Sequence, residues 1–511
     1  RSTFAGWGVD LSRVRFIQTQ TYSHWTRDWG PQSVFDGDGL YGITDPIFDG
    51  YPWVSGCDMA RAESAPASQE RPGSPDASRV GSAFPLRGGR TRGWEEDDAV
   101  NADLAAELGC PLHAFPAHCT GGNVMTDGSG GAFSTRRMLD ENQGLWNEEE
   151  FRQLAADYLG IEHYWFLDDP EVYGIQHIDC YAKLLDPETV LIKEVPTWHP
   201  EYECVERLVD QVAATTTCYG RPYRIVRIYC GTYDGSAAAG YTNSLILNGK
   251  VFVPLFNITW DSAALATYEA AMPGYEVIGF PWNGWYDYDA LHCRTMAIFD
   301  RFMLRIAHRP LDAELPLAPE FEIHALIDDR SESGLIPDAL GLLWRIAGAP
   351  DWNWEMLLAT AGTDSFAAAI PGAAPGTTIE YYLTAADQSG RVETVPPTAP
   401  VNCFRFTITA DPSGVQPPRL GPDPITEIRP TPFFSDVTIR WRASRERPPA
   451  VRILDCRGRV VRTLRPIAVG GGDATLIWNG RDDRGQLCPA GLYWIRAGGT
   501  HAPARKLLRL R

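Results

Sequence analysis

The residues best suited to chemistry are a cysteine, a histidine and two aspartates that lie far apart in the sequence. Cys293 follows acidic and aromatic turn residues and opens an apolar run, a setting in which a thiolate can be stabilised. His177 and Asp179 are two positions apart, and on a strand such residues share one face. Asp28 precedes a Gly-Pro turn. Together they are the parts of a thiol enzyme that acts on a cationic substrate.

The chemistry that fits this set is attack on a guanidinium group. A guanidinium is planar, always charged and carries five N–H donors, so two carboxylates such as Asp28 and Asp179 suit it. The Cys293 thiolate would attack the central carbon, helped by the bound cation and by a protonated His177. His177 would then give a proton to the departing ammonia and activate water. The net change is guanidine to urea, and we expect neither a metal nor an organic cofactor.

Several elements must position these residues, and their pattern predicts an α/β domain over residues 1–308. Helical and strand patterns alternate from Trp94 to Phe299. Gly109 is expected to end a helix, and Asn147 with Glu150 resembles a capping box. Asn248-Gly249 is expected to turn a hairpin. Residues 51–89 lose this periodicity, which predicts a surface loop or a disordered insertion.

The rest of the chain changes to short alternating strands. A Pro-rich joint leads into residues 320–409, where the turn spacing predicts a β-sandwich. Residues 411–424 are expected to form a Pro/Gly linker, and residues 425–511 a second all-β unit. Cys456 and Cys488 in that unit could pair or stay reduced.

The length, hydropathy and charge of the chain limit the classes of protein to which it can belong. A chain of 511 residues is expected to hold more than one domain. No apolar stretch reaches the roughly 20 residues that a membrane span needs. The net charge is −19, but residues 425–511 carry 17 Lys+Arg and 7 Asp+Glu. The acidic remainder would attract cations and repel nucleic acid, so no nucleic-acid partner is expected.

The cysteine content and the first residue of the chain carry two further expectations. The 11 cysteines include no CxxC pair, so zinc is not expected, and their odd number leaves at least one free thiol. The start at Arg1, without an initiator Met, favours a mature or trimmed product, or a chosen expression boundary.

Five motifs resemble those of bacterial peptidylarginine deiminases and occur in the same order. Agmatine deiminases have similar motifs. The resemblance covers roughly residues 10–300, interrupted by 51–89, and implies a five-bladed pseudo-symmetric α/β propeller as the catalytic domain. The motifs are WTRDWGP from Trp25, GGN from Gly121 followed by TDG from Thr126, GIQHID from Gly174, YTNSLILNGKVFVP from Tyr241, and the Cys293 segment.

The resemblance also implies roles for individual residues. It makes Cys293 the nucleophile and His177 the acid/base, with Asp28 and Asp179 holding the guanidinium. Some bacterial members use an Arg-x-Arg pair to hold the carboxylate of a C-terminal arginine, and Arg90-Thr91-Arg92 stands at a comparable place in this chain. Here, however, the long insertion directly precedes the pair, and the residues between and after it differ. The expected catalytic residues are Cys293, His177, Asp179 and Asn243, and the expected substrate-binding residues are Asp28, Trp25, Arg90 and Arg92.

The two C-terminal units resemble modules of exported bacterial proteins. Residues 320–409 are similar to an immunoglobulin-type module. Residues 425–511, with Trp478–Gly485 and Pro489–Tyr493, are similar to a flagellar-hook-cap-like immunoglobulin domain. The resemblance therefore implies two small Ig-like sandwich domains, a secreted or cell-surface protein, and export machinery as a partner of the last domain.

Each expected site residue also has a structural interpretation. Cys293 and Trp25 could be core residues, and His177 a structural histidine. Asp28 could form a turn, Asp179 could orient His177, and Asn243 could bond only to backbone. Arg90 and Arg92 could be solvated loop residues, and Gly121–Asn123 is expected to be a tight turn that supports the pocket.

The leading hypothesis is a peptidylarginine deiminase-like hydrolase acting on arginine in peptides or proteins. The alternatives are an agmatine deiminase and a catalytically impaired surface-binding protein. A thiol protease is disfavoured, because two carboxylates facing the nucleophile would repel a developing oxyanion.

Overall fold

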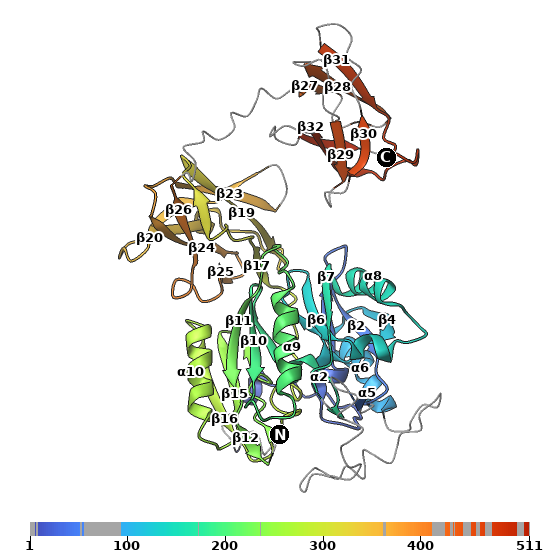
Figure 1. Ribbon diagram of the computed structural model, residues 1–511, viewed down its shortest axis with the longest axis vertical. Helices are drawn as coiled ribbons and strands as arrows, with labels where there is room; N and C mark the ends of the chain where they lie inside the picture. The colour runs from blue at the N-terminus through green and yellow to red at the C-terminus, as the bar shows by residue number, and fades with distance from the viewer. Residues whose placement is uncertain are drawn as a thin grey trace. The chain divides into compact units, whose positions relative to one another are not determined.

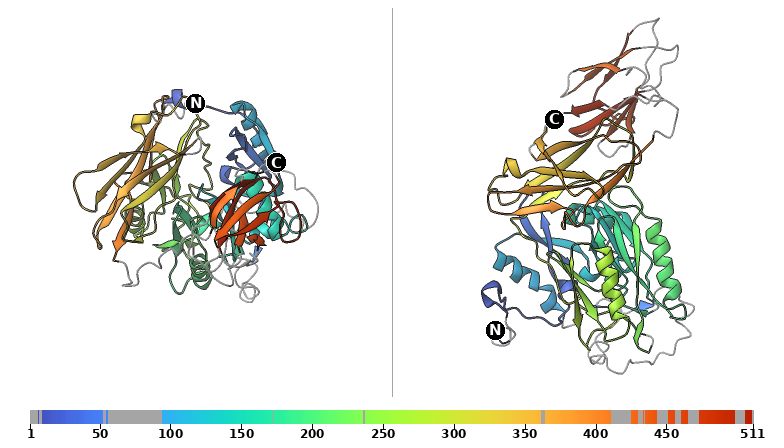
Figure 2. Two further views of the ribbon diagram at one scale, coloured as in Figure 1. Left: turned by 90° about the horizontal axis from the view of Figure 1, so that it is seen from above. Right: turned by 90° about the vertical axis from the view of Figure 1, so that its left-hand side faces the viewer.

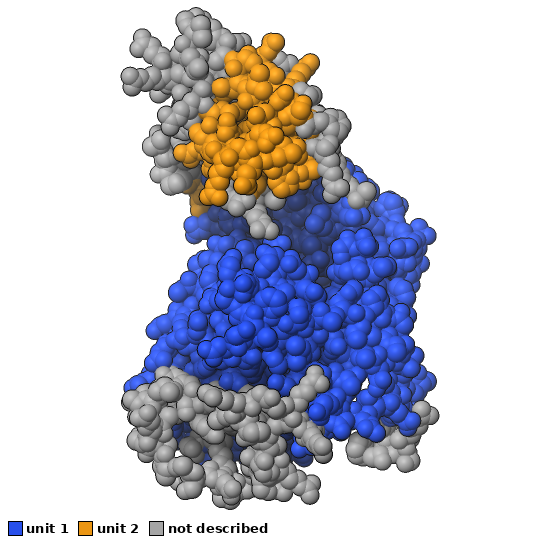
Figure 3. Space-filling view, turned by 90° about the vertical axis from the view of Figure 1, so that its right-hand side faces the viewer, with its two compact units in different colours: residues 1–408 blue, residues 409–511 orange. Residues whose placement is uncertain are grey.

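The chain separates into two compact units, residues 1–408 and 409–511, which Figure 3 colours separately. Most of the insertion expected at 51–89 lies outside the described residues, as do the expected linker 411–424 and Cys456. The computed structural model describes residues 6, 9–51, 54–55, 94–171, 173–235, 237–360, 364–410, 425–429, 433, 435–442, 451–455, 460–464, 473–497 and 505–509.

Four similar units follow one another along residues 32–281 (Figure 1). Each has an antiparallel pair of strands, then a helix, then a third strand parallel to the second. The first comprises β1 (Gln32–Phe35), β2 (Tyr41–Ile47), α6 (Val100–Leu108) and β4 (Leu112–His118). The second comprises β5 (Met125–Thr126), β6 (Gly131–Thr135), α8 (Glu148–Leu159) and β7 (His163–Leu167). The third comprises β9 (Ala182–Asp186), β10 (Thr189–Glu194), α9 (Tyr202–Ala213) and β11 (Arg224–Tyr229). The fourth comprises β14 (Leu245–Leu247), β15 (Lys250–Leu255), α10 (Asp261–Ala271) and β16 (Glu276–Pro281).

The helices of these units form where the sequence pattern predicts them. Helix α6 ends at Gly109, whose positive φ of 63° suits a residue without a Cβ. Helix α8 begins at a capping box in which Asn147 accepts from the Glu150 backbone and Glu150 accepts from the Asn147 backbone. Helix α9 buries one face and packs on β10 and β7. Strands β14 and β15 are joined at Asn248-Gly249, both with positive φ, as the hairpin pattern predicts.

Short elements connect the four units. They are η1 (Leu11–Arg13), α2 (Thr26–Trp29), β3 (Val54–Ser55), α5 (Glu95–Asp98), η2 (Gly121–Asn123), α7 (Arg137–Glu141), β8 (Tyr173–Gly174), η3 (Ile178–Cys180), β12 (Thr232–Asp234) and β13 (Ala237–Ala238). The described residues thus show an α/β body of four such units. The five-bladed propeller is not established, because no fifth unit and no closed sheet occur among them.

Residues 304–409 form two further sheets over a separate hydrophobic core (Figure 2). The first has the order β17-β19-β23-β22 and the second the order β18-β26-β24-β20-β21, with β25 beside β24. Their bounds are β17 (Leu304–Ala307), β18 (Glu314–Pro316), β19 (Glu320–Asp329), β20 (Gly341–Ile346), β21 (Asn353–Met356), β22 (Leu358–Ala359), β23 (Ser365–Pro371), β24 (Thr378–Ala386), β25 (Val392–Val395) and β26 (Phe404–Thr409), with η4 at Pro337–Ala339.

The start of this two-sheet part differs from the expected boundary at residue 308. Strand β17 pairs with β19, so residues 304–307 belong to the sheet. Its core nevertheless draws on alternate residues of β19 and β24, as the period-2 pattern predicts. An immunoglobulin-type topology for this part stays a prediction.

The C-terminal unit has its own core and its own sheets. One sheet has the order β27-β28-β31 and the other β30-β29-β32-β33. Trp478 is fully buried and packs on Phe433 and Tyr493. The strands are β27 (Ile425–Arg429), β28 (Val437–Arg442), β29 (Val451–Asp455), β30 (Val460–Leu464), β31 (Asp473–Trp478), β32 (Gly491–Ala497) and β33 (Arg505–Arg509). Among the described residues of the whole chain, no helix has the length and apolar character of a membrane span.

Candidate active site

Asp28 lies in the short helix α2 and is only 2% exposed. Both of its carboxylate oxygens have donors. The Tyr51 hydroxyl donates to Oδ2 (2.7 Å), and the Gly122 backbone N–H donates to Oδ1 (2.9 Å). These bonds come from segments 23 and 94 residues away, so the carboxylate is held by distant parts of the chain.

His177 and Asp179 do not lie on a strand, contrary to the expectation from their spacing. His177 is the extended N-cap residue of the 3-10 helix η3, and Asp179 is inside that helix. The segment is held by side chains rather than by a neighbouring strand. Asn123 Oδ1 accepts from the Ile178 N–H (3.2 Å), and the Gln176 carbonyl accepts from Thr135 Oγ1 (2.5 Å). Both functional side chains are 2% exposed.

Asn243 organises the turn that carries Cys293. Its Oδ1 accepts from the backbone N–H groups of Ala290 (3.2 Å), His292 (3.0 Å) and Cys293 (3.2 Å). Its Nδ2 donates to Cys293 Sγ (3.1 Å). Asn243 therefore fixes both the backbone and the sulfur of the expected nucleophile, and its bonds are not limited to backbone.

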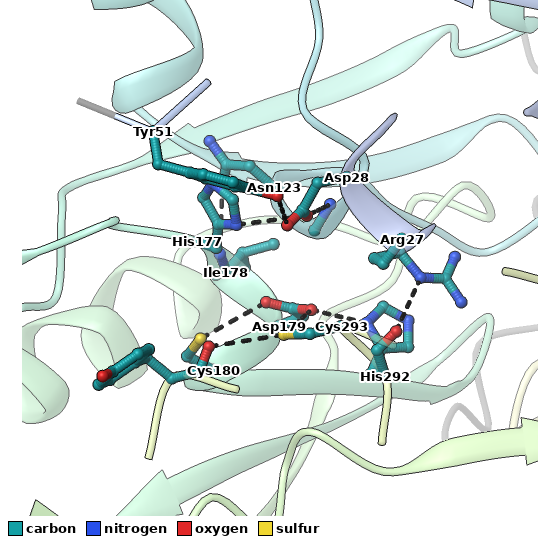
Figure 4. A network of polar contacts seen from close by, with 12 residues as sticks. Arg27, Asp28, Tyr51, Asn123, His177, Ile178, Asp179, Cys180, His292 and Cys293 are labelled. Atoms are coloured by element: carbon teal, nitrogen blue, oxygen red, sulfur yellow. Dashed lines mark hydrogen bonds and ion pairs between the residues drawn. The ribbon is translucent and has the colours of Figure 1, made fainter. Parts of the chain in front are cut away.

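Asp28, His177, Asp179 and Cys293 lie close together (Figure 4). Cys293 Sγ is 3.7 Å from Asp179 Oδ2, and His177 Nδ1 is 3.6 Å from Asp28 Oδ1. Gly122 lies against three of these side chains. A Cβ at Gly122 would lie 2.5 Å from Asp28 Oδ1, 2.8 Å from His177 Nδ1 and 3.4 Å from Asp179 Oδ2. Only a residue without a side chain therefore allows the backbone to approach the two carboxylates and the histidine this closely.

Burial controls the charge of the two carboxylates. Burial, and then the neighbouring Asp179, raise the pKa of Asp28 well above its usual value. Burial raises the pKa of Asp179 to about 6, and Lys183 and Arg27 oppose that rise. Two buried carboxylates that face the same space favour a cation there, because a cation offsets both the burial and the mutual repulsion.

The thiol of Cys293 and the imidazole of His177 are both neutral near pH 7. A hydrogen bond with Cys180 lowers the pKa of Cys293, but burial and the charges of Asp179, Asp28 and Asp289 outweigh it and raise the pKa to about 11. Burial lowers the pKa of His177 to about 3. The Nδ1 atom of His177 has no hydrogen-bond partner among the described residues, so it is available to a bound molecule.

Of the remaining expected residues, the structure describes Trp25 but not Arg90 and Arg92. Trp25 caps α2, packs edge-on against Tyr51 with ring centroids 5.1 Å apart, and is half-buried beside the core. It therefore adjoins the site while also packing on the core. Arg90 and Arg92 lie outside the described residues, and their expected role as a carboxylate clamp stays a prediction.

Some residues at the site were not among those expected from the sequence. The sequence signalled two of them weakly: Gly122 lies in the GGN motif interpreted as a supporting turn, and Cys180 directly follows Asp179. His292 had a signal of the same kind, since it directly precedes Cys293, whereas Tyr51 had none, because its partner Asp28 is distant in sequence. Among the described residues, no three His, Cys, Asp or Glu side chains are grouped as metal ligands.

Comparison with known families identifies the family of this chain. The model of the Porphyromonas-type peptidyl-arginine deiminase family matches residues 3–298. The chain belongs to this family. It is accordingly a deiminase, a hydrolase of the class that acts on C–N bonds of guanidines and amidines, as the sequence motifs predicted.

Individual relatives of this deiminase are distant. A protein of Shewanella baltica (strain OS195) named "Putative agmatine deiminase" is 24% identical over 301 residues, which are 53% of this chain and 71% of that protein. One of the same name from Yersinia pseudotuberculosis serotype I is 27% identical over 224 residues, 38% and 61% of the two chains. A solved structure titled "C. Jejuni Agmatine Deiminase" has 18% identity and a TM-score of 0.43, covering 57% of this chain and 77% of that one.

Proposed function

We propose that this deiminase converts arginine in peptides or proteins to citrulline, with release of ammonia. The observation that carries the proposal is the close grouping of Asp28, Asp179 and His177 around Gly122, with Cys293 Sγ beside Asp179. That combination matches a planar cation that must be held by carboxylates while its central carbon is attacked by a thiolate.

In the proposed first step, the guanidinium lies against Asp28 and Asp179. Its positive charge offsets the carboxylates that keep the pKa of Cys293 high, so substrate binding favours the thiolate. Cys293 Sγ then bonds to the guanidinium carbon, and the thiol proton passes through His177 to one nitrogen. That nitrogen leaves as ammonia, and the carbon stays bound to sulfur as a positively charged thiouronium.

In the proposed second step, His177 takes a proton from a water molecule that attacks the same carbon. The C–S bond breaks, the sulfur leaves as the Cys293 thiol, and the carbon keeps the water oxygen as a ureido carbonyl. The proton that remains is accepted by the released ammonia.

The competing substrate is agmatine, and the names of the relatives support it at least as well as the family description supports peptides. Both substrates present the same guanidinium to Asp28 and Asp179, so the site alone does not choose between them. The two-sheet part and the C-terminal unit that follow the deiminase body favour a macromolecular substrate, which is why we place peptides first.

The test is to measure ureido product in parallel from benzoyl-arginine amide, a peptide ending in arginine, and agmatine, with Cys293→Ser as the blank. Peptide turnover with a kcat/KM at least about tenfold above that for agmatine supports the proposal. The reverse order assigns the agmatine activity. No turnover of any of the three would favour the catalytically impaired binding protein.

A further inference from the structure

His292, the residue before the nucleophile, contacts the carboxylate that faces the sulfur (Figure 4). Its Nδ1 is 2.7 Å from Asp179 Oδ2, and its side chain is 14% exposed. This is the shortest polar contact of Asp179 with another side chain in the described residues. Two thiols also donate to the carboxylate, Cys180 to Oδ1 (3.6 Å) and Cys293 to Oδ2 (3.7 Å), but thiols are weak donors.

Both backbone polar groups of His292, its N–H and its carbonyl, are hydrogen-bonded. Its N–H donates to Asn243, to the side-chain Oδ1 at 3.0 Å and to the carbonyl at 3.1 Å. Its carbonyl accepts from Arg27 Nε (3.4 Å). The imidazole therefore starts from a rigid position and can impose its own geometry on Asp179.

We propose that His292 is a positioning residue: by donating Nδ1–H to Asp179 Oδ2, it holds that carboxylate at the angle at which it receives the substrate guanidinium. This inference rests on the proposed function, in which Asp179 binds the cation. Asp179 needs such a constraint, because a carboxylate held only by two thiols could turn toward either sulfur.

The proton count agrees with this direction of donation. Burial, and then the positive charges of Arg27 and Lys183, lower the pKa of His292 well below its usual value. A neutral imidazole carries one proton, and its other nitrogen is an acceptor. An ionised Asp179 can only accept, so the proton lies on Nδ1 when the carboxylate is charged.

The two nitrogen positions of a histidine can be tested separately. An asparagine places its amide close to the position of Nδ1, whereas a glutamine places its amide close to the position of Nε2. We therefore compare His292→Asn, His292→Gln and His292→Leu in the full chain. The Gln and Leu variants should raise KM for the guanidinium substrate by about tenfold or more, since a hydrogen bond to a charged group is lost. The Asn variant should stay within about threefold of the wild type.

A second measurement separates positioning from general damage. Haloacetamidines are cations that alkylate a thiol after binding to carboxylates, whereas iodoacetamide is neutral. The Gln and Leu variants should lower the rate of Cys293 alkylation by the haloacetamidine relative to the iodoacetamide rate, by a factor similar to the rise in KM. His163→Gln, at an exposed position on β7, is the matched control and should change neither rate.

The inference would be overturned if all three variants had the KM and the alkylation ratio of the wild type. It would also be overturned if the Asn variant were as impaired as the Leu variant. A parallel fall in both alkylation rates would assign His292 a purely structural role. If the Leu variant does not fold, the Asn and Gln pair decides alone. Because the alkylation ratio needs no turnover, it distinguishes a failure of this inference from a failure of the proposed function.

Discussion

Carboxylates and burial dominate the environment of Cys293, which is unusual for a nucleophilic thiol. Reactive cysteines normally lie near cations that lower their pKa. Here burial, Asp179, Asp28 and Asp289 raise the pKa of Cys293 to about 11, even though Arg27 and Lys183 interact with it. The arrangement is reasonable if the substrate is a further cation, because a bound guanidinium then shifts the thiol toward the reactive thiolate.

Cys293→Ser should remove activity without unfolding the protein. A serine hydroxyl is a much weaker nucleophile, so kcat/KM should fall at least about a thousandfold. The substitution replaces only the sulfur and leaves the Asn243 bonds to the backbone, so the free energy of unfolding should change by less than about 1 kcal/mol. Citrulline formation comparable to that of the wild type would contradict the assignment of the nucleophile.

Substrate affinity should depend on the charge of Asp179. Its pKa is raised to about 6, so it is ionised above that pH and protonated below it. A cation binds the ionised form better, so the dissociation constant measured on Cys293→Ser should rise as the pH falls below about 6, by up to about tenfold per pH unit. Asp179→Asn should bind weakly and should lose the part of this dependence that Asp179 supplies, because Asp28, whose pKa is also raised, remains. A dissociation constant that is flat from pH 5 to pH 7 would contradict the role.

At the scale of elements, the sequence predicted regular structure well and the site segments poorly. Helix α6 with its Gly109 end, the α8 capping box and the Asn248-Gly249 hairpin all follow from short-range patterns. The segment around His177 does not, because three residues of 3-10 helix show no periodicity. Its shape depends on distant partners, such as the Asn123 amide, and on the positive φ of Gln176.

The same reason explains which site residues were found. Motifs predicted Cys293, His177, Asp179, Asp28 and Asn243, and the structure places Asp28, His177 and Asp179 beside Gly122, Cys293 beside Asp179, and Asn243 beside Cys293. Tyr51 and His292 act on aspartates 23 and 113 positions away in the chain. Only the folded arrangement shows such pairs.

Gly122→Ala tests whether the close approach of this glycine to the two carboxylates and the histidine is needed. The added methyl would lie too close to Asp28 Oδ1 and His177 Nδ1, so these side chains would have to leave the positions in which they are proposed to act on the guanidinium. Since misplacement of about 1 Å can cost a hundredfold, kcat/KM should fall by at least about that factor. Gly37→Ala is the control, because a Cβ there meets no atom within 4 Å. Similar activities of the two variants would show that the pocket lies elsewhere.

At the scale of the whole molecule, the two-sheet part is closely bonded to the α/β body. Arg221 Nη1 donates to the carbonyls of Pro310 (3.2 Å) and Leu311 (3.0 Å). Thr398 Oγ1 donates to the Pro273 carbonyl (2.8 Å), and Arg330 Nη1 to the Gly39 carbonyl (3.0 Å). Among the described residues, the buried cluster of the C-terminal unit is made of residues from Phe433 to Leu507, with Ile428 packed against it.

Two truncations should therefore behave differently. A chain that ends at residue 410 should keep kcat/KM within about twofold of the full chain, because the C-terminal core is complete without the deiminase body. A chain that ends at residue 303 exposes the partners of the two-sheet part and should unfold at a lower temperature. Equal unfolding temperatures, or loss of turnover in the folded 410-residue chain, would contradict this division.

The C-terminal unit also bears on where the protein acts. We propose that it serves export or surface attachment and that the enzyme is secreted, on the basis of its resemblance to terminal modules of exported proteins. Peptides outside the cell would then be the natural substrates, and the enzyme needs a way to choose them over small guanidines.

That choice must come from the end of the substrate far from the guanidinium. A peptide that ends in arginine carries a carboxylate close to its side chain, whereas agmatine has no carboxylate and ends in an ammonium group. Arg90 and Arg92 are predicted to bind that carboxylate. Charge-assisted hydrogen bonds contribute roughly 1.5–3 kcal/mol each, and about 1.4 kcal/mol corresponds to a factor of ten.

Arg92→Ala should therefore lower kcat/KM for a peptide with a free C-terminal arginine by about tenfold or more, while turnover of agmatine does not fall. The control substrate is the same peptide with an amidated C-terminus. It offers no carboxylate, so its kcat/KM should fall little in the Arg92→Ala variant. Arg92→Lys keeps the charge but not the planar guanidinium. Its kcat/KM for the free-acid peptide should lie between the values of the wild type and of Arg92→Ala. Equal losses on the free and amidated peptides would make the arginine structural, and no loss on either would place it in a solvated loop, leaving selection to other residues.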